Sequence, residues 1–388
     1  KPVGVYLSGG LDSSSVAAIA ARCKDEKIYG FTQVPMADYK DWLSQRRIAD
    51  EREYVKELAA FCVGIETTFV ASEGISAWDE INCQMQAIEQ PYKTFENSCW
   101  MNEILRQASA MGVGVMLDGQ SGNATVSWGN WDAYIRYLLD SLHFMEYYRE
   151  KRLLAEKRNA KLMRLILHDL YQYAPHQIKK YRYESRGGKN HFQALSPINF
   201  EFMRSMQVEA RFTGLGVGPL FSDKGGSFAQ RYRLLCPAVF SHLATMETKI
   251  PLDLGMVRRD PTRDKRLIEF CMNIPENQWV RGGYERRLIR QAMQGYLPDM
   301  IRLNTTIRGQ QAADWMQRIL PHWGQITAEI AGIGENDLAR KYLDIDRIKN
   351  LLNNNRVLDC SKGNNADIRL LLRALIFTRF LRAEFGNV

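Results

Sequence analysis

The sequence predicts an α/β fold in which a parallel sheet is followed by a mainly helical half. Over the first part of the chain, short apolar runs alternate with helical patterns, and the runs that end at Leu7 and Leu117 lead into glycine turns. Short apolar strands separated by helices are typical of parallel sheets covered on both faces. From about Trp131 onward, amphipathic helical patterns replace the strand pattern. We therefore expect an α/β core over residues 1–130 and a helical portion over residues 131–388.

Four strands and three helices are expected in the core, in alternation along the chain. The strand segments are short apolar runs, and the helical segments carry apolar residues at helical spacing. The expected strands are Val3–Leu7, Ile28–Thr32, Glu66–Val70 and Val113–Leu117, and the expected helices are Ser14–Arg22, Asp50–Cys62 and Leu105–Met111. No strand signal of similar strength follows the last of these strands. Ligands of parallel sheets bind at the carboxyl ends of the strands, so both glycine turns lie at the predicted ligand edge.

The composition is that of an ordinary soluble globular protein, and the length of 388 residues suggests more than one lobe. No stretch approaches the roughly 18 uninterrupted apolar residues of a membrane span, and no signal peptide is visible. The seven cysteines are scattered without a CxxC pair, which favours reduced thiols in a cytoplasmic setting. The first apolar run begins just after Lys1, so we expect an upstream portion of the protein.

The net charge of +8 permits several kinds of anionic partner. Basic residues are interleaved with acids rather than gathered in long runs. We therefore expect a polyanionic small substrate or a solvated basic face. We do not expect nucleic acid or a membrane as a partner.

The most specific motif is the segment Ser8-Gly9-Gly10-Leu11-Asp12-Ser13-Ser14, directly after the first strand. It lacks the lysine of a Walker A loop, but its glycines let the backbone approach a phosphate, and the amides of the following helix face an anion. Asp12 repels phosphate by itself, and its presence makes sense where Mg²⁺ bridges it to phosphate oxygens. We expect its side chain on an exposed loop. The structural alternative is a turn in which Asp12 and Ser13 cap the helix.

Together with other segments, this loop resembles that of the ATP pyrophosphatase (adenine nucleotide α-hydrolase-like) enzymes. Within them it is most similar to asparagine synthetase and its relatives, β-lactam synthetase and the lasso-peptide cyclases. The similarity keeps the same order from Lys1 to about Trp315. The matching segments are Asp50-Glu51, Glu89-Gln90-Pro91, Arg259-Asp260-Pro261 followed by Asp264, Arg286 to Arg290, and Leu297-Pro298.

The resemblance implies an ATP-dependent carbon–nitrogen ligase that uses ATP and Mg²⁺. In such enzymes a substrate carboxylate attacks the α-phosphorus of ATP, which gives an acyl-adenylate and pyrophosphate, and an amine or ammonia then attacks the acyl carbon. The resemblance places adenine beside Leu7, Phe31 and Thr32, and the ribose and the intermediate beside Asp118 and Gly119. The ATP-binding loop is Ser8, Gly9, Gly10, Asp12, Ser13 and Ser14, with Asp12 also on the metal.

The second glycine loop, Asp118-Gly119-Gln120-Ser121-Gly122-Asn123-Ala124, departs from the family pattern Ser-Gly-Glu-Gly-x-Asp-Glu. Gln120 stands in the catalytic position of a glutamate near the reacting acyl group and cannot act as a general base. Asn123 stands at the second metal-binding aspartate and offers an uncharged oxygen. Asp118 is a candidate to restore some of the missing negative charge.

Two further departures concern charged residues. Val257 replaces a family acid, and either Arg302 or Arg308 takes the place of the family's lysine, where an arginine can neutralise pyrophosphate but donates a proton less readily. Two interpretations stay open. We favour an active enzyme with a different substrate and nucleophile over a degenerate nucleotide-binding homologue that has lost the chemistry.

Several partners are compatible with this resemblance. The acid is a small-molecule or peptide carboxylate, and the reaction is that of an asparagine synthetase or of a macrolactam cyclase acting on a precursor peptide. Nothing like the family's N-terminal cysteine glutaminase precedes Val3. Ammonia or a substrate amine is therefore used directly, or a glutaminase-like domain lies upstream. A tRNA-modifying enzyme with the same loop is the alternative from another class.

Other signals have a functional and a structural interpretation each. Ser127–Trp131 forms a substrate wall or an aromatic packing corner. Arg186–Lys189 forms a lid over phosphates or a solvated loop, and His191 beside it is the one histidine of interest. The remaining candidates are Glu89, Asn97 and Trp100, which line an acyl pocket or cap and pack helices, and Arg286, Arg287 and Arg290, which clamp an anion or form surface salt bridges.

Overall fold

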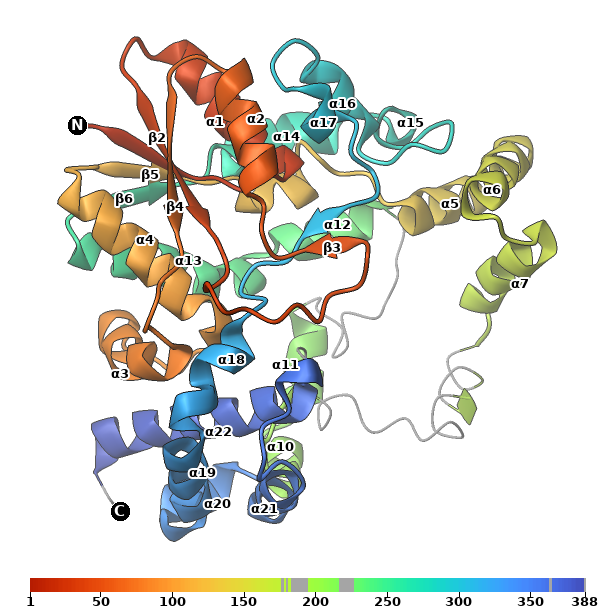
Figure 1. Cartoon of the computed structure of the whole chain (residues 1–388). Helices are drawn as coiled ribbons and strands as arrows, with labels where there is room; N and C mark the ends of the chain where they lie inside the picture. The colour runs from red at the N-terminus through yellow and green to blue at the C-terminus, as the bar shows by residue number, and fades with distance from the viewer. Residues whose placement is uncertain (176–177, 179–180, 183–194, 216–226, 363–364, 387–388) are drawn as a thin grey trace.

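Five short parallel strands form the main sheet of the protein, in the order β4-β2-β1-β5-β6 (Figure 1). The computed structural model describes residues 1–388 apart from 176–177, 179–180, 183–194, 216–226, 363–364 and 387–388. The strands are β1 (Val3–Tyr6), β2 (Ile28–Gln33), β4 (Ile65–Val70), β5 (Val115–Leu117) and β6 (Val257–Arg259). β1 lies in the middle, with Val3 opposite Ile28 on one side and opposite Val115 on the other. The prediction of an α/β fold with a parallel sheet is confirmed.

The fifth strand, β6, lies in the part of the chain where no strand signal of similar strength was found. β6 lies at the edge of the sheet and pairs with β5 alone, with Val257 opposite Val115. β6 is three residues long and contains two arginines. As an edge strand it has a paired strand on one side only, so it does not require a continuous apolar run. Its strand character comes from the pairing partner, which lies far away in the sequence. The α/β sheet therefore draws on both halves of the chain.

Helices cover both faces of this sheet. On one face, α1 (Leu11–Cys23) and α2 (Arg52–Phe61) bury Val16, Ala17, Val55 and Leu58 against strand residues such as Val5. The other face carries α3 (Ala77–Ile88), α4 (Ser98–Ala110) and α13 (Pro237–Asp253). Figure 1 shows α1 and α2 together on one side of the sheet and α3, α4 and α13 on the other. Covering both faces explains why the central strand β1 reads as a nearly continuous apolar run.

The C-terminal helices belong to the core beneath the second face of the sheet. The long helix α22 (Ala366–Phe385) buries Leu371, Leu375 and Ile376 completely, and these side chains join the same cluster as Met116 of β5. The division at residue 130 is thus not a division between two hydrophobic cores. The helices that complete this part are α18 (Trp315–Ile319), α19 (Trp323–Ala331), α20 (Asp337–Tyr342) and α21 (Ile345–Asn354).

An arm of three helices projects from the side of the molecule (Figure 1). It consists of α5 (Trp131–Asp140), α6 (Phe144–Arg158) and α7 (Leu162–Gln172). A third cluster of buried residues, including Trp128, Trp131 and Trp279, fixes the base of the arm. The remaining helices are α10 (Phe200–Ser205), α11 (Val208–Gly214), α12 (Ser227–Leu235), α14 (Lys265–Met272), α15 (Glu276–Trp279), α16 (Arg287–Ala292) and α17 (Asp299–Arg302).

Two features complete the description. A second, two-stranded sheet pairs β3 (Arg47–Ile48) with β7 (Arg308–Gly309), so that Arg47 lies opposite Arg308. Within the described ranges, no helix combines the length and apolar character needed to cross a lipid bilayer.

Candidate functional site

The loop after β1 is closed on itself by its own serines. The hydroxyl oxygens of Ser8 and Ser13 lie 2.8 Å apart, and the Ser13 oxygen also accepts from the Ser8 amide at 3.1 Å. The Ser14 hydroxyl donates to the Ser8 carbonyl at 3.0 Å, and its side chain is fully buried. The serines thus set the shape of the turn. Gly10 is the N-cap of α1 and no side chain caps this helix, so Asp12 does not serve as a cap.

Glycines allow two other segments to touch this loop. A Cβ added at Gly9 would come within 2.5 Å of Tyr54 in α2. In the second loop, a Cβ at Gly122 would lie 2.3 Å from the Asp12 carboxylate, and one at Gly119 would lie 2.9 Å from the Asp12 backbone. The two glycine loops are therefore in direct contact at the carboxyl edge of the sheet.

Asp12 lies where the two glycine loops meet, and the charge of its carboxylate is only partly compensated there. Its Oδ2 lies 3.5 Å from the guanidinium of Arg286, which also donates to the side-chain oxygen of Asn123. Burial raises the pKa of Asp12, and the charge of Arg286 opposes this rise. Its Oδ1 is buried and has no hydrogen-bond partner in the part of the chain that the structure describes. The expectation that Asp12 lies on an exposed loop is wrong, because the second loop covers it and leaves its side chain 16% exposed.

Asp12 and Asn123 together offer two oxygens to a metal. No group of three His, Cys, Asp or Glu side chains that could hold a metal is present among the described residues. Mg²⁺ is often bound by one or two protein oxygens plus substrate phosphates. The unpaired buried oxygen of Asp12 fits a metal of that kind. Arg286 pairs with the other Asp12 oxygen, Oδ2, and bonds to the Asn123 oxygen, so this guanidinium would compete with a metal for Asn123.

A cleft of about 1170 Å³ opens beside the first loop. Gly9, Gly10 and Asp12 form part of its wall, together with Arg286 at the N-cap of α16 and Arg290 in its last turn. Other parts of the wall come from β3 and β7, from the end of α6, and from the segment before β7. The sequence-predicted phosphate loop and two of three arginines expected as an anion clamp therefore line one space.

Of the two arginines that were alternatives for the family's lysine, the structure brings only Arg308 to the cleft. Arg308 lies in β7 and lines the wall. Arg302 is bonded through its guanidinium to Asp299 at 2.7 Å and to the carbonyl of Arg290, and it is not part of the wall. The position of Arg308 depends on the pairing of β7 with β3.

Glu51 links the first loop to β7. Its side chain is 8% exposed, and the backbone of Gly9 donates to it. A Cβ at Gly309, next to Arg308, would meet the Glu51 carboxylate at 2.2 Å, so a larger residue there would displace this carboxylate. Burial raises the pKa of Glu51 from 4.5 to about 7, the Gly9 hydrogen bond opposes this rise, and the neighbouring Asp50 adds to it.

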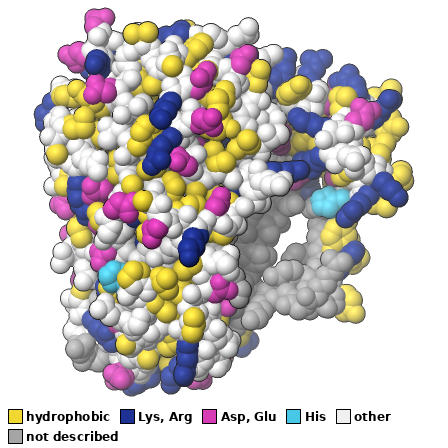
Figure 2. Space-filling view, viewed as in Figure 1, with side chains coloured by type: hydrophobic (Ala, Val, Ile, Leu, Met, Phe, Trp, Pro, Cys, Tyr) yellow, Lys and Arg dark blue, Asp and Glu magenta, His cyan; other side chains and the backbone are white. Residues whose placement is uncertain are grey.

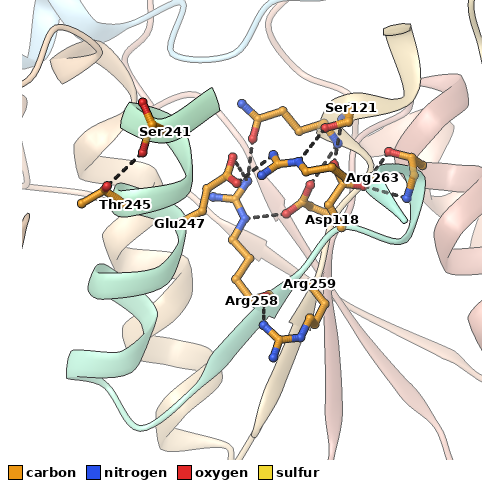
Figure 3. Close-up of polar contacts among 11 residues, drawn as sticks. Asp118, Ser121, Ser241, Thr245, Glu247, Arg258, Arg259 and Arg263 are labelled. Carbon is orange, nitrogen blue, oxygen red and sulfur yellow. Dashed lines mark hydrogen bonds and ion pairs between the residues drawn. The ribbon is translucent and has the colours of Figure 1, made fainter. Parts of the chain in front are cut away.

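Asp118 and Gln120 are both bound to one buried arginine (Figure 3). Arg258, in β6, donates through Nε to Asp118 at 2.5 Å and through Nη2 to Gln120 at 2.9 Å. Its guanidinium also lies over the ring of Tyr6, at 5.1 Å from the centroid. The charge of Asp118 is thus neutralised by Arg258 and is not directed at the metal-binding residues. Gln120 is placed to orient groups, and it has no carboxylate to accept a proton.

The same network extends to α13 and to the segment after β6. Arg263 bonds to Glu247 at 2.8 Å and to the hydroxyl of Ser121 at 3.0 Å, while the amide of Ser121 donates to Asp260. Burial raises the pKa of both Glu247 and Asp260, and nearby arginines hold that of Glu247 down. Figure 3 shows Arg258 and Arg263 both directed toward Glu247. The second loop is therefore fixed by ion pairs on the side away from Asp12.

The residues expected beside adenine lie in the packed interior. Leu7 is 3% exposed and Phe31 is 1% exposed, and they belong to clusters on opposite faces of the sheet. The Leu7 amide donates to the Phe31 carbonyl at 2.8 Å. The hydroxyl of Thr32 is buried without a hydrogen-bond partner among the described residues, so it retains a donor for a ligand. None of the three lines the cleft.

The other candidates show packing and surface contacts. Glu89 is exposed and bonds to Lys249, and Asn97 accepts a bond from the buried Trp100. Trp128 and Trp131 are buried in the cluster at the base of the arm, although Trp131 also reaches the cleft. Arg287 is bonded to Gln278 and does not line the cleft. Arg186–Lys189 and His191 lie outside the described residues.

Sequence reasoning missed three charged residues of the site, namely Glu247, Arg258 and Arg263. Arg258 stands directly before Arg259-Asp260-Pro261, and the similarity drew attention to that segment while leaving its neighbour out. The pairing of Arg258 with Asp118, 140 residues apart, has no local sequence signal. The available sequence signal was the pair of adjacent arginines, Arg258 and Arg259, directly after a short apolar run.

Comparison with protein families gives one match. The model of a family described as asparagine synthase matches residues 1–366, nearly the whole chain. This span includes both glycine loops, the buried arginine network and β7. No curated protein sequence matches the chain.

Proposed function

The chain belongs to the asparagine synthase family, and from this premise we propose that it forms amide bonds through an acyl-adenylate, with release of AMP and pyrophosphate. ATP-dependent amide ligation is the general chemistry of the family. The observation that carries the proposal is the cleft in which the Gly9–Asp12 loop faces Arg286, Arg290 and Arg308. Backbone amides at a helix start and arginines are the groups that bind and stabilise a leaving pyrophosphate.

Each step assigns a task to residues of the cleft. A carboxylate oxygen of the substrate attacks the α-phosphorus of ATP, the bond from that phosphorus to the bridging oxygen breaks, and pyrophosphate leaves with the electron pair. Arg308 and Arg290 neutralise its charge. The nitrogen of an amine or ammonia then attacks the acyl carbon, AMP leaves, and the nitrogen loses a proton to solvent. Gln120 takes no proton and orients the loop through Arg258.

Asp12, with the oxygen of Asn123, would hold Mg²⁺. The metal would offset the charge of the phosphates. For this, Arg286 must leave the two oxygens that it now bonds. The same guanidinium is then available to the phosphates of the nucleotide.

A specific observation favours a second candidate, a nucleotide-binding homologue without ligase chemistry. Arg286 bonds to the Asn123 oxygen and pairs with Oδ2 of Asp12, and Arg258 neutralises Asp118. If neither arginine moves, ATP binds weakly and no acid is adenylated. The size of the cleft favours the active alternative, and it also favours a peptide carboxylate, as in macrolactam formation, over a small acid.

The test is release of AMP and pyrophosphate, measured with Mg·ATP across aspartate, glutamate, acidic peptides and ammonia. We expect acid-dependent AMP formation by the wild-type chain and its loss in Asp12→Asn, because the neutral amide holds a metal less well. The control is Asp337→Asn, since Asp337 also lies in the first turn of a helix but is 65% exposed. ATP binding in a titration without AMP formation from any acid would favour the second candidate.

A further inference from the structure

The wall of the cleft carries many more basic than acidic side chains. Its wall includes seven arginine and lysine residues and three acids. One of the acids, Asp12, is already paired with Arg286. A magnesium–triphosphate complex offsets only part of this excess, because the metal itself neutralises about half of the triphosphate charge. The remaining positive charge requires another explanation.

The excess comes from cations without carboxylate partners. Arg46, Arg158 and Arg308 make no ion pair anywhere in the described part of the chain. Arg47 bonds to the neutral side chain of Gln310, and Lys157 donates to the Gly283 carbonyl at 2.9 Å. Outside the cleft, some arginines are paired with acids, as Arg106 is with Glu80, so the cleft is distinguished by how many cations without an acidic partner it gathers in one space. Unpaired cations that crowd one cleft repel each other, and an anionic ligand removes this repulsion.

These cations form two groups that come from different parts of the fold. Arg46, Arg47 and Arg308 belong to the β3–β7 pair, beside the Gly9–Asp12 loop that Glu51 joins to it. Lys157 and Arg158 end α6 of the projecting arm. The first group is placed to neutralise the phosphates of ATP. The second lies on an element that the phosphate loop does not touch, and Figure 2 shows basic side chains on this arm.

The arm contributes a wall of mixed apolar and basic character. Leu154 and Trp131 line the cleft next to Lys157, Arg158 and Asn159. One acid, Glu285, also lies in this part of the wall, where it accepts a hydrogen bond from the Trp131 amide at 2.9 Å. Because Leu154 and Trp131 are buried, Lys157 and Arg158 are the side chains that this part of the wall offers, and they suit a ligand that carries carboxylates. A nucleic acid fits less well, because both aromatic side chains in the described wall, Tyr54 at 8% and Trp131 at 3% exposure, are buried and offer no face for base stacking.

We propose that Lys157 and Arg158 bind negative groups of the acyl substrate, and that this substrate is a polycarboxylate such as an acidic peptide. The inference rests on the proposed ligase function and specifies its substrate class. Cations in the last turn of a helix also offset the helix dipole. That role would affect the stability of the arm and leave substrate affinity unchanged, so the two explanations are separable.

The experiment measures binding of a short fluorescent peptide of alternating glutamate and glycine to the full chain, by anisotropy. The reference peptide has glutamine in place of each glutamate. We expect the acidic peptide to bind at least about tenfold more tightly than the reference. We expect the double variant Lys157→Ala/Arg158→Ala to weaken it by about tenfold, as for the loss of two charge contacts. The charge-keeping variant Lys157→Arg/Arg158→Lys should retain most of the affinity.

The matched control is Arg152→Ala. Arg152 lies on the same helix, is 68% exposed, pairs with Glu156 and does not line the cleft. Its removal should leave peptide binding unchanged. Equal binding of the two peptides, or equal effects of the control and the double variant, would overturn the proposal. Displacement of the peptide by bulk tRNA at lower concentration, with a steep salt dependence, would overturn it in favour of nucleic acid.

AMP formation separates this proposal from the proposed function. The double variant should raise the KM for an acidic peptide about tenfold and leave the KM for ATP unchanged. If the peptide binds selectively but no acid yields AMP, the ligase function fails and the anion site stands. If acids with a single carboxylate and acids with several carboxylates yield AMP with the same KM, the ligase function stands and the proposed substrate class is wrong.

Discussion

The substitution Glu51→Gln tests whether the carboxylate between the first loop and β7 is buried as the structure places it. Glu51 is 8% exposed, lies against Gly309 and accepts from the Gly9 backbone. Burial raises its pKa from 4.5 to about 7, so the folded state binds a proton more tightly than the unfolded state does. The folded state therefore loses stability as the pH rises from about 4.5 through about 7.

The size of this loss follows from the rise in pKa. From 4.5 to about 7, at ~1.4 kcal/mol per pH unit, the ionised carboxylate costs about 3 kcal/mol of folding free energy. Glutamine has the same shape and cannot ionise. The variant should therefore gain stability relative to wild type between about pH 5 and about pH 8, by about 2 to 3 kcal/mol.

Urea unfolding at the two pH values measures the effect, with the midpoint and slope fitted for each protein. Glu53→Gln is the control, because Glu53 lies on the same helix and is exposed. Its stability should follow that of wild type at both pH values. If the free energy of unfolding of Glu51→Gln changes with pH as that of wild type does, the carboxylate is solvated in the folded protein. The account of how the first loop is joined to β7 would then be wrong.

Three other substitutions probe the remaining parts of the site. Asn123→Asp should lower the Mg²⁺ concentration needed for AMP formation several-fold, because it adds a carboxylate beside Asp12, and an unchanged Mg²⁺ dependence would remove the residue from the metal site. Arg258→Met should cost about 3 to 5 kcal/mol in urea unfolding by leaving a buried carboxylate network unpaired; a loss below about 1 kcal/mol would show that these charges are solvated. Arg308→Ala should slow pyrophosphate release at least about tenfold, the loss of one strong charge contact, whereas Arg302→Ala should not, and equal effects would contradict their placement.

The strand, turn and helix of the first loop could be predicted because all of their information is local. An apolar strand, a glycine turn and a helix start follow one another within the first residues, and the serines that shape the turn bond to one another. The prediction for Asp12 was right about its place in the loop and wrong about its exposure. Its covering comes from Gly122, which approaches only because the second loop packs onto α1.

Residues that act through distant partners could not be predicted in this way. Arg258 lies in an edge strand without an apolar run, and its partner Asp118 is 140 residues away. Arg308 and Arg302 looked equivalent in the sequence, and only the pairing of β7 with β3 separates them. Charge balance between such residues depends on three-dimensional distance, which no spacing along the chain records.

By itself, the sequence determined the parallel α/β core, the position of the first glycine loop and the resemblance to asparagine synthetase. Each of these depends on the order of neighbouring residues, since strand, turn and helix signals act over a few positions. Only the tertiary structure decided which charges meet. It directed Asp118 to Arg258 and Asp12 to Arg286, and it left the cations at the end of α6 unpaired in the cleft. The physical reason is that electrostatic energy depends on distance and burial, and folding sets both.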